Sequence, residues 1–387
     1  MVDVNKYFME LSKKFDKNYF DFLILISKNK NYSYENVQLI LKAYRVANGL
    51  HANQKRKSGE AYISHPLNVA YVLAQAGFDY ETVCAALLHD TVEDTNYTLK
   101  DIEENFGKNV AILVDGVTKM KKSNFANKKE QKSATHEKIL ECITKDARII
   151  AIKLVDRLHN MFTLGALPPD KQIEIATETD EFYVNLARIL GIYQIKDELQ
   201  DLSLFYLNPG EFIKYNEIRN KIKREHIDEC RYIGNRTKEI LKDMNVDMEY
   251  NFKVKNVGAI YGEEKKGIGV YDIHDLVAIR MIVSKIDECY EALSVLKRIC
   301  SIIDGSENDL IKNPKYNGYR SLNVNVNTYK DSQMQVRIRT YEMQKANELG
   351  FVSNWSVDSQ KILTKKCSKL FKANQEEIRI KKDVFKI

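Results

Sequence analysis

The sequence is poor in the residues that interrupt helices. It contains five prolines and 16 glycines among 387 residues. Proline ends or kinks a helix and glycine weakens one, whereas the lysine, glutamate and leucine that are plentiful here favour helices. We therefore expect a high helix content.

Long apolar runs and paired cysteines are also missing. The most apolar runs, such as residues 22–26 (FLILI), are far shorter than the roughly 20 residues that span a bilayer, and no apolar signal segment follows Met1. The six cysteines form no CxxC pair, which excludes the usual patterns of a disulfide framework or a thiolate zinc site. We expect a cytoplasmic protein with reduced cysteines and no membrane partner.

No strong charge of either sign is present. The formal net charge of +6 comes partly from lysine-rich stretches at 119–132 and 361–382, which we interpret as a solvated loop and tail. No direct nucleic-acid binding is predicted. Because 44% of the residues are apolar, the chain should fold into two or three domains rather than stay disordered.

Apolar periodicity divides the chain into two parts of different fold class. From about 34 to 207, apolar residues recur at three- and four-residue spacing, which predicts an all-helical domain, interrupted by a loop at 121–133. Later, the apolar run 276–283 and the alternating stretches 322–326 and 334–338 predict strands, with a helix near 288–303 between them. The fold class is therefore multidomain, α followed by α/β. The predicted divisions are a helical domain at 1–207, a helical linker at 208–235, a mixed α/β domain at 236–357 and a basic helix or tail at 358–387.

Polar groups that suit metal chemistry interrupt the first, helical part. Helical spacing puts His89 one turn before Glu93, and Asp90 one turn before Asp94, on one side of a helix. Asp156 lies within an otherwise apolar helix at 148–161, where a buried carboxylate is costly unless it is paired or binds a metal. Imidazole and carboxylate ligands without thiolates suit a divalent transition metal better than a structural zinc site.

Four motifs in this part resemble the hydrolase domain of RelA/SpoT homologues, a branch of the HD-type metal phosphohydrolases. They are RKSGEAYISHP (56–66), ALLHDTVEDT (86–95), VDGVTK (114–119) and KLVDRLHNM (153–161). The resemblance runs from about 40 to 205 and implies an HD-superfamily fold. It also implies site roles: His65, His89, Asp90 and Asp156 would hold manganese, Glu93 and Asp94 would serve the attacking water, and Arg56, Lys57, Ser58, Asn160 and Thr163 would bind the guanosine nucleotide.

Those implied roles are chemically consistent. Attack of water on a diphosphate needs a metal that acidifies the water and a carboxylate that takes the proton. The planar guanidinium of Arg56 can stack on a purine. His51, His136 and His159 match no ligand position, and we interpret them as structural or exposed. The family's arginine after Asn-Met is Phe162 here, so the preference between ppGpp and pppGpp stays open.

The second part resembles the (p)ppGpp synthetase domain of the same family. The motifs are DIHDLVAIR (272–280), DECY (287–290), NGYRSL (317–322) and IRT (338–340), within a resemblance that covers about 250–357. It implies a nucleotidyltransferase-like fold, in which Asp275 would be the magnesium aspartate and Tyr319 would stack on the guanine of GDP or GTP.

Other positions depart from that resemblance. The family's Glu-x-Gln-Ile-Arg-Thr is QVRIRT (335–340), so a neutral amide, Gln335, replaces the carboxylate that would bind magnesium and deprotonate the acceptor. Loss of a general base typically costs about 10² to 10⁴ in rate. Further departures are Ala259 for a serine and Glu263 for a lysine near the expected ATP phosphates, and Asn323 and Asn354 for histidines. We predict a degenerate synthetase domain that keeps its fold and GDP or GTP binding through Tyr319 and regulates the hydrolase. The neutral Gln335 weakens the expectation of Mg²⁺ at its site.

The sequence as a whole favours a manganese-dependent hydrolase that removes the 3′-pyrophosphate of (p)ppGpp. A bifunctional synthetase and hydrolase is the main alternative, and it would need another carboxylate in place of Gln335. A non-catalytic nucleotide sensor is the third interpretation. Longer members of the family continue into regulatory domains, and the oligomeric state is not predicted.

Overall fold

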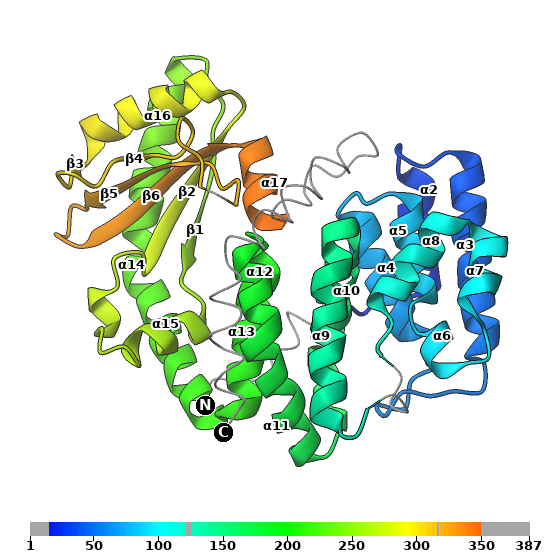
Figure 1. Cartoon of the computed structure of the whole chain (residues 1–387). Helices are drawn as coiled ribbons and strands as arrows, with labels where there is room; N and C mark the ends of the chain where they lie inside the picture. Colours follow the sequence, from blue (N-terminus) through cyan, green and yellow to red (C-terminus); the bar gives the residue numbers. More distant parts are fainter. Residues whose placement is uncertain (1–14, 121–124, 316, 350–387) are drawn as a thin grey trace. The chain divides into compact units, whose positions relative to one another are not determined.

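The computed structural model describes residues 15–120, 125–315 and 317–349. The described residues form two compact units, divided along the chain between Ile175 and Ala176; Figure 1 labels their helices and strands. The predicted divisions at 207 and 235 do not coincide with that point. The predicted linker instead forms part of one continuous helix, α14 (Pro209–Asp243). The predicted tail and Asn354 lie outside the described residues.

The first unit consists of packed helices. In chain order these are α2 (Tyr19–Lys28), α3 (Tyr34–Leu50), α4 (Ser64–Gln75), α5 (Tyr80–Leu88), α6 (Thr91–Asp94), α7 (Leu99–Phe106), α8 (Lys108–Val117), α9 (Lys128–Lys145), α10 (Arg148–Phe162), the 3₁₀ turn η2 (Leu164–Ala166) and α11 (Pro169–Glu178), which ends just past the division. Helix α10 is buried along most of its length and packs against α4, α8 and α9. This central position places the polar residues of α10 inside the unit.

Two local predictions in this unit need correction. The loop predicted at 121–133 is wrong in its second half, because α9 begins at Lys128; the Asn127 side chain accepts a hydrogen bond from the Glu130 backbone N–H and caps the helix. Residues 121–124 lie outside the described residues. The single helix expected through His89 and Asp94 is instead divided, with α5 ending at Leu88 and α6 beginning at Thr91.

A buried ion cluster connects the start of α10 to the start of α5. The Arg148 side chain is 2% exposed and donates hydrogen bonds to Asp146 (2.7 Å), Asp79 (3.0 Å) and Glu81 (2.7 Å). Asp79 also caps α5 by accepting from the Thr82 backbone N–H. One guanidinium therefore pairs with three carboxylates that gather near the first turn of a helix.

Replacing Arg148 by methionine should destabilise the first unit by about 3–5 kcal/mol, because the carboxylates would remain buried without their cation. Denaturant unfolding followed by circular dichroism would measure the shift. Replacing the exposed Arg45 by methionine is the matched control and should change stability by less than about 0.5 kcal/mol. Equal unfolding midpoints for the two variants would contradict the assigned role of the cluster.

The second unit contains helices around a mixed sheet. The helical elements are η3 (Thr179–Val184), α12 (Asn185–Ile189), α13 (Tyr193–Leu207), α14, α15 (Val257–Glu264), the 3₁₀ turn η4 (Val270–Asp272), α16 (Ile286–Ile299) and α17 (Tyr341–Leu349). The strands are β1 (Glu249–Val254), β2 (Val277–Val283), β3 (Ser301–Ile302), β4 (Asn308–Asp309), β5 (Leu322–Asn327) and β6 (Gln333–Thr340). The strands β2, β5 and β6 and the helix α16 confirm the sequence prediction, whereas the sequence does not predict β1, β3 or β4.

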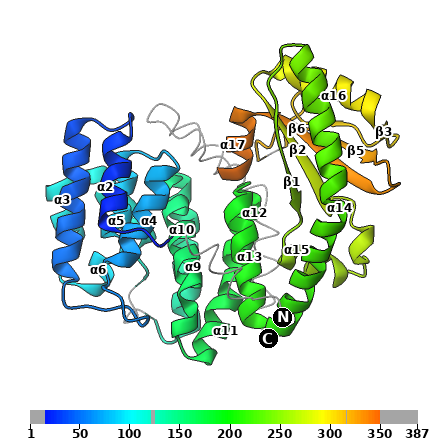
Figure 2. The same cartoon turned by 180° about the vertical axis from the view of Figure 1, so that it is seen from behind.

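The sheet order is β1-β2-β6-β5-β3, and β4 pairs with β5. Strands β2 and β6 are parallel, and the other neighbouring pairs are antiparallel. Helices α14 and α16 pack on each other and on the sheet (Figure 2). Burial alternates along β5, with Leu322, Val324 and Val326 buried. Because side chains alternate between faces, the residues between these apolar positions point to the other side of the sheet.

Candidate active site

Three separate elements bring the predicted metal ligands together in the first unit. His65 is the second residue of α4, His89 follows the last residue of α5, and Asp156 lies in the middle of α10 (Figure 1). One ligand atom from each of these residues lies within 4.8 Å of the others. All three residues are buried, so the cluster is shielded from bulk water.

Asp90 completes this group. The Nε2 atom of His89 lies 3.2 Å from Asp90 Oδ1 and 3.8 Å from Asp156 Oδ1. The Nε2 atom of His65 lies 3.2 Å from Asp156 Oδ1 and 3.7 Å from Asp90 Oδ2. Two imidazoles therefore point their Nε2 atoms at the same two carboxylates.

The His89 ring is oriented as a ligand. Its Nδ1 lies 2.8 Å from the carbonyl oxygen of Ala86, which can only accept, so Nδ1 carries a proton. Its Nε2 is buried and makes no hydrogen bond of normal geometry. Burial disfavours the charged ring, but Asp90 and Asp156 outweigh this effect and raise the pKa of His89 to about 9. The carboxylates thus stabilise a cation at Nε2, whether that cation is a proton or a metal.

The carboxylates are held in their ionised form. Burial would raise the pKa of Asp156, but the ammonium of Lys153 and the nearby imidazoles of His65 and His89 keep that pKa well below its usual value. Lys153 Nζ lies 2.9 Å from Asp156 Oδ2, which leaves Oδ1 facing the imidazoles. A set of two imidazoles and two ionised carboxylates fits a divalent metal.

His159 contacts the predicted metal ligand His65. The Nδ1 atoms of the two rings lie 3.0 Å apart, so one of them donates to the other. His159 is itself buried and packs edge-on against Phe15. A hydrogen bond of this kind fixes the ring of a metal-binding histidine. His159 is therefore structural and buried rather than exposed, and the sequence did not predict its contact with His65.

Glu93 and Asp94, the acidic pair, lie on α6 beside the predicted metal ligands. The Tyr62 hydroxyl lies 2.6 Å from Asp94 Oδ2 and 3.0 Å from Asp90 Oδ2, and so connects the pair to the ligand set. Glu93 accepts hydrogen bonds from the backbone N–H and the ammonium of Lys119, at 2.6 and 3.2 Å. The sequence analysis named neither Tyr62 nor Lys119 as a site residue, although both stand within the motifs at 56–66 and 114–119.

Part of the predicted nucleotide pocket is assembled next to these groups. Arg56 donates to Asn160 Oδ1 at 2.8 Å and to Thr163 Oγ1 at 3.3 Å. Asn160 in turn donates to Asp156 Oδ1 at 2.6 Å. Lys57 and Ser58 are exposed beyond Arg56. Asn160 therefore contacts the cluster directly, and Arg56 and Thr163 are linked to it through Asn160, whereas the structure does not place Lys57 and Ser58 in that network.

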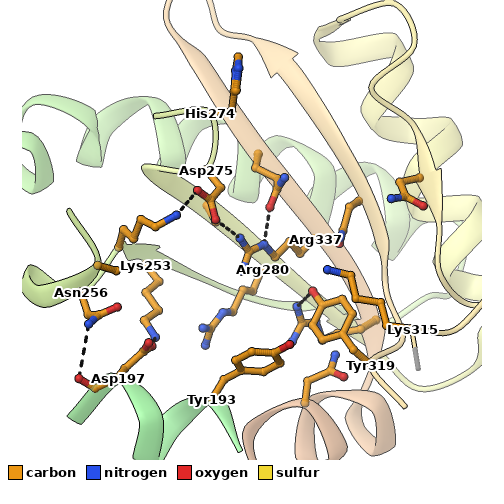
Figure 3. A pocket seen from close by; sticks show the side chains of 18 of the residues that line it. Tyr193, Asp197, Lys253, Asn256, His274, Asp275, Arg280, Lys315, Tyr319 and Arg337 are labelled. Carbon is orange, nitrogen blue, oxygen red and sulfur yellow. Dashed lines mark hydrogen bonds and ion pairs between the residues drawn. The ribbon is translucent and has the colours of Figure 1, made fainter. Parts of the chain in front are cut away.

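A separate pocket of about 840 Å³ lies in the second unit (Figure 3). Its lining includes all three synthetase-like residues named from the sequence: Asp275, Tyr319 and Gln335. Ala259 and Asn323 also line it. Glu263, expected near the phosphates, instead pairs with Lys266 at 3.1 Å and is not among the lining residues, because it lies farther along α15.

Comparison with known proteins assigns both units. Residues 43–193 match the model of the HD domain, and residues 253–361 match the model of the region found in RelA/SpoT proteins. The chain belongs to the RelA/SpoT family.

Curated relatives in this family carry names of more than one activity. The chain is 38% identical to a guanosine-3′,5′-bis(diphosphate) 3′-pyrophosphohydrolase of Aquifex aeolicus, with 83% of the chain and 46% of the relative covered. It is equally similar, at the same coverage, to the bifunctional (p)ppGpp synthase/hydrolase SpoT of Escherichia coli. A GTP pyrophosphokinase of Myxococcus xanthus is 37% identical, with 87% of the chain and 45% of the relative covered. The chain thus spans slightly less than half the length of these relatives.

The family match accords with the first unit's geometry. An HD domain indicates a divalent metal, and the buried His65, His89 and Asp156 provide a suitable cluster. None of the helices in the described residues is both long and apolar enough to cross a bilayer. The names of the relatives do not decide between hydrolysis, synthesis or both.

Proposed function

We propose that the first unit hydrolyses the 3′-pyrophosphate of ppGpp and pppGpp, releasing pyrophosphate and GDP or GTP. The observation that carries this proposal is the cluster of buried His65, His89 and Asp156 with the partly exposed Asp90, linked through Asn160 to Arg56. A metal-ligand set joined to a guanidinium through one amide suits a substrate that is both a purine nucleotide and a diphosphate. The relatives' names support the same substrate.

The ion proposed for this site is manganese, held by His65, His89, Asp90 and Asp156. Bound there, a divalent ion supplies Lewis acidity and lowers the pKa of water. Imidazole with carboxylate is compatible with Mn²⁺, and the absence of thiolate ligands in this cluster disfavours a structural zinc site. Equilibrium dialysis against Mn²⁺, Mg²⁺ and Zn²⁺ would test the choice of metal.

The acidic pair is proposed to manage the proton of the attacking water. Glu93 is anchored by Lys119, and Asp94 is anchored by Tyr62, so neither side chain swings freely. Either carboxylate is of the type that accepts a proton from water as the new oxygen–phosphorus bond forms. Arg56 and Asn160 are proposed to hold the nucleotide, with Thr163, Lys57 and Ser58 at the edge of its pocket.

The synthetase-like unit is proposed to be inactive in (p)ppGpp synthesis. Gln335 lies in the pocket where the family has a carboxylate, and an amide cannot accept the proton of the acceptor hydroxyl. The alternative, a bifunctional enzyme, is favoured by the relative named as a synthase and hydrolase. It requires another base, and the two aspartates that line the pocket, Asp197 and Asp275, are both paired with lysines.

One pair of incubations separates these functions. The protein is mixed with ppGpp and Mn²⁺, and separately with ATP, GDP and Mg²⁺, and the nucleotides are resolved by anion exchange. We expect ppGpp to be converted to GDP and the second mixture to stay unchanged. Alarmone formed in the second mixture would establish the bifunctional alternative, and no turnover in either mixture would favour a nucleotide sensor.

A further inference from the structure

Three arginines on neighbouring strands of the sheet line the pocket of the second unit. Arg280 of β2 and Arg337 and Arg339 of β6 all line the pocket, and each is directly next to a buried apolar residue on its strand. The parallel register pairs Arg280 with Arg337. Two guanidinium groups therefore stand on neighbouring strands of one sheet face, where like charges repel.

The excess of positive charge extends around the pocket. Its lining holds seven lysine and arginine side chains and two aspartates: Lys196, Lys253, Lys255, Arg280, Lys315, Arg337 and Arg339, with Asp197 and Asp275. Asp197 pairs with Lys196 and with Lys253. Asp275 pairs with Lys255 and with Arg337. Seven cations and two carboxylates leave the lining with an excess of five positive charges, which makes the pocket suited to a polyanion.

Magnesium does not fit the residues at this position. Asp275 Oδ1 is ion-paired with Lys255, and Asp275 Oδ2 accepts from Arg337 at 3.3 Å. The amide oxygen of Gln335, which replaces the second carboxylate, accepts from Arg337 Nε at 2.6 Å. Both oxygen groups that a magnesium ion would need are thus bound by fixed cations of the protein.

Arg337 itself replaces a neutral residue of the family pattern. The pattern Glu-x-Gln-Ile-Arg-Thr, aligned with 335–340, has glutamine where this chain has Arg337. The pair of differences removes a negative charge at 335 and adds a positive charge at 337. Together the two differences change the charge by +2, which is the charge of a divalent metal ion. Arg337 contacts Gln335 and Asp275, the two positions where the family pattern has magnesium ligands.

We propose that this pocket binds a nucleoside polyphosphate without a metal ion, with Arg337 supplying the positive charge that magnesium would bring. The inference extends the proposed loss of synthesis and does not depend on hydrolysis in the first unit. Phosphate oxygens pair well with the planar guanidinium groups of Arg280 and Arg337. The ligand is bound rather than converted, because the pocket lacks the carboxylate base.

An aromatic platform for the base lies next to these cations. Figure 3 shows Arg280 and Arg337 between Asp275 on one side and Tyr193 and Tyr319 on the other. The Tyr319 hydroxyl accepts from Arg339 at 3.0 Å, and the Tyr193 hydroxyl accepts from Asn317 Nδ2 at 2.9 Å. Lys315 lies over the Tyr319 ring at 5.3 Å, and Tyr193 packs edge-on against the same ring at 6.1 Å, so aromatic rings and cations share this pocket. Phosphates and base can thus be bound within one pocket.

The test measures binding of GDP to the full chain by isothermal titration calorimetry, in EDTA and again in Mg²⁺. We expect dissociation constants that agree within about twofold between the two buffers. Replacing Arg337 by glutamine should weaken GDP binding in EDTA roughly tenfold or more, as loss of a charge-assisted hydrogen bond does. The control is Arg236→Gln on the exposed side of α14, where the arginine contacts Glu239.

A second variant tests whether charge replacement is the mechanism. The double variant Gln335→Glu with Arg337→Gln restores the family's carboxylate and amide, and its GDP binding should now require Mg²⁺. Thermal unfolding checks that each variant is folded. GDP binding that needs Mg²⁺ in the unmodified protein, or that is unchanged in Arg337→Gln, would overturn the proposal.

Binding at the two units is distinguished by Arg56→Gln. If this variant abolishes the metal-independent GDP binding, the ligand occupies the first unit and the inference is wrong. Alarmone formation from ATP and GDP would disprove the loss of synthesis, and a lack of ppGpp hydrolysis would disprove the function proposed for the first unit. Neither of these two results would change the GDP binding that calorimetry measures in EDTA.

Discussion

Replacing His89 by alanine is expected to remove the bound metal and to reduce ppGpp hydrolysis by about 10³-fold or more, because the ion supplies both the activated water and the charge stabilisation. His89 Nε2 is buried and directed at Asp90 and Asp156, with no other hydrogen-bond partner of normal geometry. Metal content by mass spectrometry and hydrolysis by anion exchange would be measured on the same sample.

The matched control is His136→Ala in the same unit. His136 lies on α9, is partly exposed and is absent from the cluster of candidate metal ligands. It should retain metal and hydrolysis. A His89→Ala protein that keeps a full equivalent of metal would contradict the ligand assignment. A protein that loses its metal but hydrolyses ppGpp normally would contradict the metal-dependent mechanism.

Replacing Glu93 by glutamine is expected to lower the hydrolysis rate by roughly 10² to 10⁴ while the metal content stays unchanged, because the amide keeps the shape but cannot accept a proton. The glutamine that replaces Glu93 keeps one side-chain oxygen, which can still accept the hydrogen bond from the Lys119 backbone N–H. The decisive comparison is the turnover number at saturating ppGpp and Mn²⁺.

Glu104→Gln is the control for removing one carboxylate. Glu104 is exposed on α7 and pairs only loosely with Lys100, at 3.8 Å. The Glu104→Gln variant should hydrolyse ppGpp at the rate of the unmodified protein. If Glu93→Gln also retained full activity, the proton would have to pass to Asp94, and the corresponding Asp94→Asn variant should then show the large loss.

Much of the first site was predictable because its chemistry is unusual for a helical core. A carboxylate at Asp156 within an apolar helix requires a partner, and the motif containing His65 supplies one. The supporting residues were harder to predict. A tyrosine, a lysine and a second histidine are common in helices, and only the fold shows that Tyr62, Lys153 and His159 contact the ligand set.

Helix boundaries near the site were also decided beyond local sequence. Periodicity predicts one helix through His89 and Asp94, but the chain divides it into α5 and α6. The backbone N–H of Asp94 still bonds to the Asp90 carbonyl, so the interruption is small. Metal-ligand side chains on α4 and α10 pack against this point, and such tertiary contacts override a local preference for continuous helix.

The sequence by itself determined the two fold classes and the family resemblance, because periodicity and motifs are local properties, and the resemblance named the residues that the fold brings into one cluster. Only the tertiary structure decided which charges meet. Nothing in the spacing of Lys255, Asp275 and Arg337 shows that the aspartate is held between the two cations. That contact depends on the register of β2 with β6, strands that are separated by about fifty residues of chain, and pairing between distant strands is a property of the whole sheet.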